Sequence, residues 1–135
     1  MTSPIIELIK MENSFKVEPK KLLVEFKLTG VYSFSEFKNF FESVLSHPDF
    51  KPGFKILCDA QDMDFSKMTP DDIYELVKLD NEIKVKRGAG KTAFLVKGDL
   101  QFGLSRMLEL RRDINRQDPL RVFKNPDEAR RWLGI

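Results

Sequence analysis

The chain has 135 residues, a length that fits one domain and leaves little for a second. Hydrophobic residues make up 41% of it and charged residues 33%, as is typical of a soluble globular protein with a packed core. The net charge of +2 gives no indication of a nucleic-acid partner, and no apolar run approaches the roughly 18 residues that a membrane span needs.

The first residues and the cysteine content both indicate a cytoplasmic protein. The chain begins without the basic start and apolar run of a secretory signal. Cys58 is the only cysteine, so an internal disulfide cannot form and a reducing compartment is expected.

Two segments before residue 30 are predicted to be strands. Ile5–Lys10 is short and apolar. In Leu22–Leu28, the apolar residues Leu22, Val24, Phe26 and Leu28 alternate with Glu25 and Lys27, which is typical of a strand with one solvent-exposed face. We expect that this strand could pair or pack across a homodimer.

A helix is predicted to begin after Ser33, because Glu36 follows at the spacing of a capping box. Its apolar stripe comprises Phe34, Phe37, Phe41, Val44 and Leu45. At this spacing the phenylalanines are expected to belong to the core, with a ligand pocket as the alternative. Pro48 ends the helix.

The middle of the chain is predicted to contain a strand, a helix and a second strand. The first strand is Phe54–Asp59. Thr69 then caps a helix whose buried stripe comprises Ile73, Leu76, Val77 and Ile83, and the basic turn Lys86–Lys91 closes it. Thr92–Val96 is an uninterrupted apolar run, typical of a strand buried on both faces, so we place it centrally.

The last third is predicted to form helix, strand and helix. Asp99 caps the first helix, whose inward side chains are expected to be Leu100, Leu104, Met107, Leu108 and Ile114. Leu120–Phe123 is the strand, and the final short helix docks through Ala129, Trp132 and Leu133. The order ββαβαβαβα predicts an α/β protein with a mixed five-stranded sheet and four helices.

The sequence contains no clear catalytic motif, so we expect no enzyme and no cofactor. Gly90-Lys91-Thr92 lacks the earlier glycine of a phosphate-binding loop and precedes a strand instead of a helix. His47 is expected to end a helix, and Cys58 to be an inert core thiol.

Charged residues are unevenly distributed. Residues 59–82 hold eight acids against two lysines, and residues 100–135 hold eight bases against five acids. We expect solvated faces, among them one carrying Arg106, Arg112, Arg116, Arg121, Arg130 and Arg131, with an acidic protein or a membrane surface as the next alternative. Asp59, Asp62 and Asp64 are expected to cap turns rather than to bind a metal ion, and a magnesium site is the weaker alternative.

Four stretches resemble the SpoIIAA-like group, the wider STAS-type domains related to anti-sigma-factor antagonists. They are His47–Gly53, Leu57–Asp62, Gly103–Met107, and Arg121–Phe123 followed by Asp127–Ala129 and Trp132–Leu133. The resemblance implies that residues 1–135 form a single STAS-type domain, a non-catalytic module that binds proteins or small ligands. Classical members of the group are switched by phosphorylation of a serine in an Asp-Ser-Ser-Gly type motif at the start of the second helix. The matching stretch here is Asp64–Pro70, which lacks the paired serines and the glycine, and its candidates for phosphorylation are Ser66 and Thr69.

The resemblance therefore implies a regulatory protein-interaction module with a protein partner, and no nucleic-acid partner is expected. The alternative is a carrier or sensor of a lipid or another small apolar ligand. Because ligands of open α/β sheets settle at the carboxyl ends of the strands, the functional surface is predicted there. Its rim is expected to comprise Asp59, Asp62, Ser66, Thr69, Asp99 and Arg106.

Overall fold

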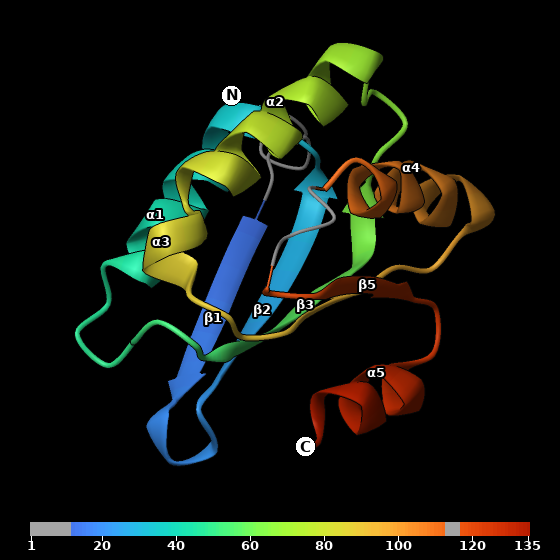
Figure 1. Ribbon diagram of the computed structural model, residues 1–135. Helices are drawn as coiled ribbons and strands as arrows, with labels where there is room; N and C mark the ends of the chain where they lie inside the picture. Colours follow the sequence, from blue (N-terminus) through green and yellow to red (C-terminus); the bar gives the residue numbers. More distant parts are fainter. Residues whose placement is uncertain (1–11, 113–116) are drawn as a thin grey trace, which may run out of the picture.

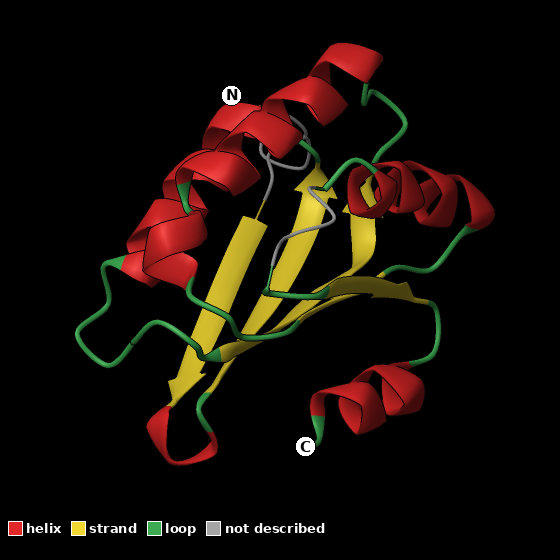
Figure 2. Cartoon of the chain, viewed as in Figure 1, coloured by secondary structure: helices red, strands yellow, loops and turns green. Residues whose placement is uncertain are grey.

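Five strands form one mixed sheet, in the order in which they occur along the chain. They are β1 (Glu12–Glu18), β2 (Leu23–Val31), β3 (Lys55–Asp64), β4 (Thr92–Leu95) and β5 (Leu120–Phe123). The first pair is antiparallel and the other three are parallel. The structure is a computed structural model that describes residues 12–112 and 117–135 (Figure 2).

Helices cover the two faces of the sheet unequally (Figure 1). The crossovers contain α1 (Phe34–Leu45), α2 (Pro70–Glu82), the single-turn α3 (Lys84–Arg87) and α4 (Asp99–Leu110), all on one face. The C-terminal α5 (Pro126–Leu133) packs on the opposite face. Because the strand order never reverses, crossovers of one hand place their helices on the same side.

The predicted order of elements is confirmed, with two differences at its margins. The described residues contain five α-helices where four were expected, because α3 follows α2 after one residue, Ile83. The strand predicted at Ile5–Lys10 lies outside the described residues. The first described strand, β1, was not predicted, because Phe15 and Val17 are its two large apolar residues among charged neighbours.

The boundaries of β2 differ from the prediction at both ends, because the strand begins one residue later, at Leu23, and continues three residues further, to Val31. Val24, Phe26 and Leu28 are buried on one face as expected. Leu22 instead closes the 3-10 turn η2 (Pro19–Lys21) with a φ of 52° and is 57% exposed. Strand β2 is hydrogen-bonded to a strand on each side, so it cannot pair across a dimer.

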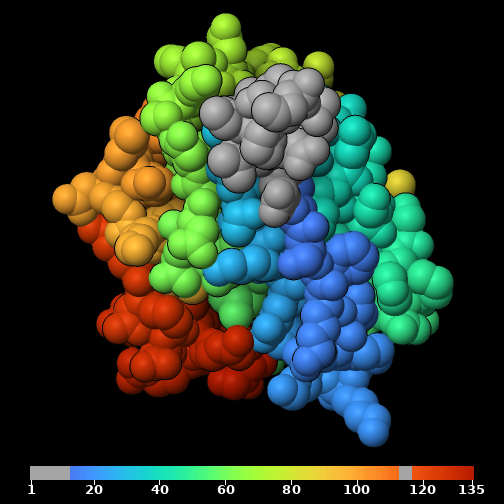
Figure 3. Space-filling model, turned by 180° about the vertical axis from the view of Figure 1, so that it is seen from behind, coloured from blue at the N-terminus to red at the C-terminus, as the bar shows by residue number. Residues whose placement is uncertain are grey.

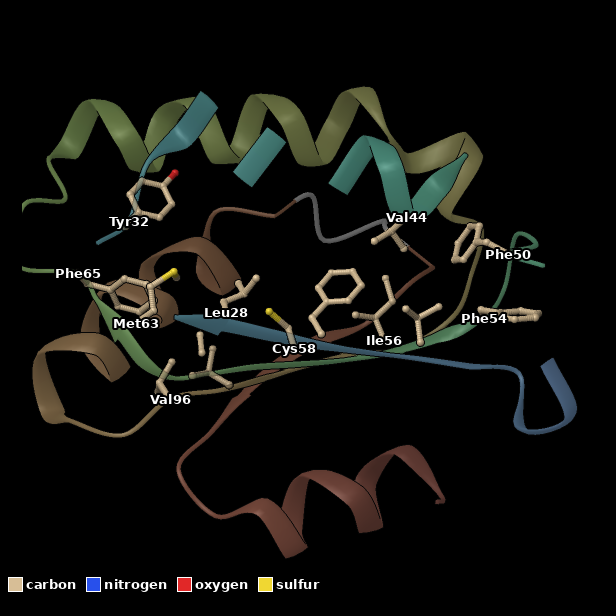
Figure 4. Close-up of a cluster of buried hydrophobic side chains, with 14 residues drawn as sticks. Leu28, Tyr32, Val44, Phe50, Phe54, Ile56, Cys58, Met63, Phe65 and Val96 are labelled. Carbon is tan, nitrogen blue, oxygen red and sulfur yellow. The ribbon is translucent and has the colours of Figure 1, made fainter. Parts of the chain in front are cut away.

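Two apolar cores lie on either side of the sheet. The larger core packs the sheet against α1, α2 and α4, and Figure 4 shows its side chains between the sheet and the helical layer. The smaller core packs Leu23, Leu57 and Leu95 against Ala129 and Leu133 of α5. The face of β2 that was predicted to be exposed is therefore partly covered.

Strand β3 is longer than predicted, which moves its carboxyl end. It continues from Lys55 to Asp64, with a register shift against β2 between Lys27 and Thr29. Asp59 and Asp62 are therefore strand residues, and the prediction that Asp59 ends the strand is wrong. The three aspartates Asp59, Asp62 and Asp64 have low strand propensity, which hid the extension from sequence reasoning.

The inward face of α4 was predicted only in part. Leu104 and Leu108 face the core, but Leu100 is 57% exposed and Met107 36%. The predicted Ile114 lies outside the described residues. The helix begins after Gly98, so Asp99 is its first residue and not its cap. Leucines occur on several sides of α4, so periodicity alone did not identify the packed side.

Candidate ligand pocket

An apolar pocket lies between the sheet and the helices that cover its larger core. Ile56 and Cys58 of β3 and Phe94 of β4 contribute to its lining from the sheet. Phe37 and Phe41 of α1 line it as well. Two members of the phenylalanine stripe therefore line a pocket, which was the alternative to a purely structural role.

Helix α2 contributes to the pocket along much of its length. Ile73, Leu76, Leu79 and Ile83 all line the pocket. From Ile73 to Ile83 an α-helix rises about 15 Å, so the lining is elongated along α2. Met63 and Met68 are also part of the lining, and methionine side chains adapt readily to changes in the shape of a cavity. The volume of the pocket is about 80 Å³.

Tyr32 brings a polar group to this apolar lining. The residue is 8% exposed, and its ring lies edge-on to that of Phe65 at 6.3 Å between centroids. Its hydroxyl has no hydrogen-bond partner in the described part of the chain. In Figure 4 this oxygen points away from the sheet, toward the helical layer. Burial raises the pKa of Tyr32, and the charges of Asp72 and Glu75 raise it further, so the hydroxyl keeps its proton and can donate it.

An ion-pair cluster of Arg112, Asp80 and Asp118 connects α2 with the far end of α4. Arg112 Nε lies 2.7 Å from Asp80 Oδ2, and Arg112 Nη2 lies 3.0 Å from both Asp80 Oδ1 and Asp118 Oδ2. The three side chains are largely buried, and Asp80 and Arg112 both line the pocket. The prediction that Arg112 lies on a solvated face is wrong, and Arg116 of the same predicted face lies outside the described residues.

The buried guanidinium of Arg87 also lines the pocket, and several hydrogen bonds hold it in place. Although only 2% exposed, it donates to the carbonyl oxygen of Phe54, to those of Gly90 and Lys91 at 3.0 and 2.9 Å, and to Thr92 Oγ1 at 3.0 Å. A planar guanidinium suits this role because its donors are directed to several acceptors at once. The segments that begin β3 and β4 are thereby fastened to α3.

The structure separates the six residues predicted for the rim of the functional surface. Asp59 and Asp62 lie by Lys27, whose Nζ is 3.2 Å from Asp59 Oδ2 and 3.0 Å from Asp62 Oδ2. The hydrogen bond from Lys27 to Asp62 raises the pKa of Lys27 most, and the hydrogen bond to Asp59 raises it further. Asp59 and Lys27 face the α5 side of the sheet, away from the pocket. Asp59 is paired in register with Leu95, the last residue of β4, and Asp62 lies two residues before the end of β3.

Ser66 and Thr69 lie after the carboxyl end of β3, as expected. Asp64 Oδ1 accepts a hydrogen bond from the Ser66 amide at 2.8 Å. Hydrogen bonds from the Ser66 side chain and backbone lower the pKa of Asp64. Thr69 caps α2 in a reciprocal arrangement with Asp72, whose Oδ2 accepts from the Thr69 amide at 2.8 Å. Both candidates for phosphorylation are exposed.

Asp99 and Arg106 make their own ion pairs. Asp99 follows β4 and pairs with Lys124, which lowers the pKa of Asp99. Arg106 pairs with Glu109 at 2.6 Å, and Glu109 Oε2 accepts from the Val122 amide of β5 at 3.2 Å. Thus Ser66, Thr69 and Asp99 share one edge of the sheet, while Arg106 lies on α4 beside β5.

The isolated reactive side chains occupy separate elements. His47 lies in the turn after α1, where its Nδ1 accepts from the Asp49 amide at 3.1 Å. Cys58 is 2% exposed in β3, and burial raises the pKa of its thiol. Within residues 12–112 and 117–135, no group of three or more His, Cys, Asp or Glu side chains is placed to hold a metal ion. In the same residues no helix is long and apolar enough to cross a membrane.

Sequence reasoning missed most of the polar groups around the pocket. Tyr32 follows a strand with nothing in its neighbours to mark it as buried. Asp80 and Arg112 are 32 residues apart, and their pairing depends on how α2 packs beside α4. Leu79 was omitted from the predicted stripe of α2, although the i, i+3 spacing from Leu76 to Leu79 was visible.

Comparison with known proteins identifies the fold. A solved structure of an uncharacterized protein of the DUF3478 family from Shewanella loihica PV-4, described as having a SpoIIAA-like fold, is similar over 98% of each chain. The TM-score is 0.61 and the sequence identity is 18%. No family model matches this sequence, and no curated protein matches it. The chain has the SpoIIAA-like fold, as its sequence motifs predicted.

Proposed function

We propose that this SpoIIAA-like chain is a non-catalytic module that binds a small apolar molecule in the pocket beneath α2. The observation that carries the proposal is the combination of an almost entirely apolar lining with the buried, unpartnered hydroxyl of Tyr32. A buried donor without a partner costs free energy, and a ligand that accepts its hydrogen bond recovers that cost. Apolar pockets with a few polar groups are the usual sites for small ligands.

The size of the pocket restricts the shape of the ligand. An engineered cavity of about 150 Å³ admits benzene, so a pocket of about 80 Å³ holds a slender chain or requires α2 to move. Met63 and Met68 can repack, and Leu76 and Ile83 are only partly buried, so a small shift of α2 enlarges the space. A straight single chain fits the elongated lining better than a fused ring system does.

The charges around Tyr32 restrict the polar end of the ligand. Asp72 and Glu75 raise the pKa of Tyr32 electrostatically, which indicates a negative potential at its hydroxyl. A carboxylate is therefore disfavoured there, and a neutral hydroxyl, ester or ketone oxygen is favoured. The proposed ligand class is an uncharged, single-chain molecule with one oxygen acceptor.

Titration calorimetry with decan-1-ol and decanoate tests this proposal. The alcohol is expected to bind more tightly than the carboxylate. Tyr32→Phe keeps the ring and removes the hydroxyl, so it should weaken binding of the alcohol about fivefold. Tyr74→Phe is the matched control, because Tyr74 is 63% exposed on α2. Failure of both compounds to bind would exclude the pocket as a site for this class, and an unaffected Tyr32→Phe would exclude the hydrogen bond.

A second function, a STAS-type protein-interaction module, is favoured by the open part of the sheet beside α5. This face, which is turned to the viewer in Figure 3, holds a hollow of about 320 Å³ lined by Lys16, Glu25, Lys27 and Gln61. Arg130 of α5 pairs with Glu25 at 2.9 Å. Alternating charges of this kind suit a polar protein partner.

Phosphate on Ser66 or Thr69 would be repelled by Asp64, Asp71 and Asp72, so modification is expected to release a partner.

Native mass spectrometry of the purified protein separates the two functions. A copurified molecule of a few hundred daltons that is lost on denaturation supports the ligand-binding function. Detection of only a ligand-free monomer or dimer favours the protein-interaction function. Chemical-shift mapping with an identified partner then locates the surface, either on the open sheet face or at the carboxyl edge.

A further inference from the structure

The sheet edge at which the parallel strands begin carries a concentration of exposed lysines. This basic edge comprises Lys20, Lys21, Lys51, Lys84, Lys86 and Lys91. Three carboxylates lie in the same segments, those of Glu18, Asp49 and Glu82. Glu18 is already paired with Lys16 at 3.2 Å and lies 4.0 Å from Lys21. The described residues of this edge therefore keep a positive excess.

Three chain segments are fastened together to form the basic edge. The Lys55 amide donates to the Leu22 carbonyl at 2.8 Å, which joins η2 to the start of β3. The Gly53 amide donates to the Arg87 carbonyl at 2.9 Å, and Arg87 holds the Phe54 carbonyl, which joins α3 to the same segment. In Figure 1 these segments lie along the lower left side of the molecule. The lysines are thus carried by segments that are hydrogen-bonded to one another.

Two exposed apolar side chains accompany the lysines. Leu22 is 57% exposed and Val85 is 81% exposed. Leu22 also adopts a φ of 52°, a region in which a leucine is unusual and a glycine or asparagine is easily accommodated. A strained, exposed leucine suggests a functional constraint, because neither its backbone conformation nor its burial favours it.

We propose that the basic edge docks on an anionic membrane surface. Lysines attract the negative headgroups, and Leu22 and Val85 enter the interface between headgroups and acyl chains. Exposed apolar tips among lysines distinguish this surface from one that binds nucleic acid, for which aromatic rings would be expected to stack on bases. The proposal is independent of what occupies the pocket beneath α2.

Co-sedimentation with vesicles tests the proposal on the full chain. Vesicles of phosphatidylcholine with roughly 30% phosphatidylserine present an anionic surface, and vesicles of phosphatidylcholine alone present a neutral one. Binding to the two kinds of vesicle is compared. Binding is expected only to the anionic vesicles and is expected to fall at high salt. The double variant Lys84→Glu/Lys86→Glu should weaken binding about tenfold or more. The matched control Lys67→Glu/Lys97→Glu, with the same charge change at the opposite edge, should bind like the wild type.

The apolar side chains are tested separately. Leu22→Gly suits the positive φ, so the variant should fold, and Val85→Ser changes an exposed side chain. Together they should weaken binding severalfold without altering the thermal melt. The proposal is overturned if the wild type does not bind anionic vesicles, or if both charge-reversal variants lose binding equally. It is also overturned if the wild type binds duplex DNA or an acidic peptide more tightly than these vesicles.

Discussion

Cys58 and Tyr32 are two buried acids in the lining of one pocket. Each is more than nine-tenths buried, and burial raises the pKa of each above its ordinary value, 9.0 for the thiol and 10.0 for the phenol. Each group therefore stays protonated in the folded protein at a pH where the unfolded chain has begun to ionise. Stability linked to these groups is complete below about pH 9 and is lost as the pH rises further.

The contribution of Cys58 to this pH dependence can be isolated with Cys58→Ala. We expect the free energy of unfolding of the wild type to fall between pH 9 and pH 10.5, with Cys58 contributing about 2 kcal/mol of the loss. The variant lacks that part of the decrease, although it is less stable at every pH because a cavity is left. Urea titrations at pH 7.5, 9 and 10.5 give the comparison. Equal pH slopes for the two proteins would mean that the thiol is not held neutral.

The two helix starts that resemble capping boxes in sequence differ in the structure. Thr69 Oγ1 accepts from the Asp72 amide, and Asp72 accepts from the Thr69 amide. Ser33 occupies the corresponding position of α1, but its side chain makes no capping hydrogen bond and lies 3.3 Å from Ser35 Oγ. The two helix starts have similar residue types, but the side-chain cap is expected to stabilise α2 more than α1.

Alanine substitution at each cap is expected to reveal this difference. Thr69→Ala should lower the free energy of unfolding by about 1 kcal/mol, because the Asp72 amide loses its acceptor. Ser33→Ala should change it by about 0.5 kcal/mol or less. Chemical denaturation of both variants provides the measurement. A larger loss from Ser33→Ala than from Thr69→Ala would show that the cap of α1 forms in solution.

Helix α5 is attached to the sheet chiefly by its most deeply buried side chains. Leu133 is 1% exposed and Ala129 is fully buried, whereas Trp132 is only half-buried. The indole packs against the ring of Phe123, with 5.6 Å between the ring centroids. Lys91 lies over the indole ring at 5.1 Å. The indole is thus a partial cover for the smaller core rather than its centre.

Truncations in α5 should follow this order of burial. Leu133→Ala is expected to cost about 3 kcal/mol and Trp132→Ala about 2 kcal/mol, less than a fully buried tryptophan would cost. Arg131→Ala, at an exposed position, should cost about 0.5 kcal/mol or less. Thermal melts of the three variants make the comparison. No change in any of them would mean that α5 is not docked on the sheet.

The whole molecule has a different helical cover on each face of its sheet. The pocket is lined by residues of α1, α2 and α4, and α5 lies on the opposite face. A ligand in the pocket is therefore expected to stabilise α2 and α4 locally more than α5. It should also raise the free energy of unfolding, by about 2.7 kcal/mol at a concentration of 100 Kd.

Hydrogen exchange with decan-1-ol present tests this asymmetry at low denaturant, where local opening dominates. Amides of α2 and α4 are expected to exchange more slowly with the alcohol, while those of α5 change little. The Tyr32→Phe variant serves as the control, and its protection should be smaller at the same alcohol concentration. Protection confined to α5 would place the binding site on the other face of the sheet.

Local sequence determined most of the elements of this protein. Thr69-Pro70 and Asn125-Pro126 are start signals that act within one turn, and both helices begin where these residues predict. The apolar run from Thr92 predicted β4 correctly. A strand that is paired on both edges and covered on both faces needs successive apolar side chains. Such features depend on neighbours in the chain, so they can be read without knowing the fold.

Tertiary structure decided which side chains meet. The acids after Cys58 became part of β3 because β2 supplied hydrogen bonds beyond the predicted end of the strand. Asp59 and Asp62 consequently form ion pairs with Lys27 of β2. The buried hydroxyl of Tyr32 and the pairing of Arg112 with Asp80 exist because α2 lies between α1 and α4 on one face of the sheet. These contacts join residues far apart in the chain, and no local pattern encodes which distant surface will cover a given side chain.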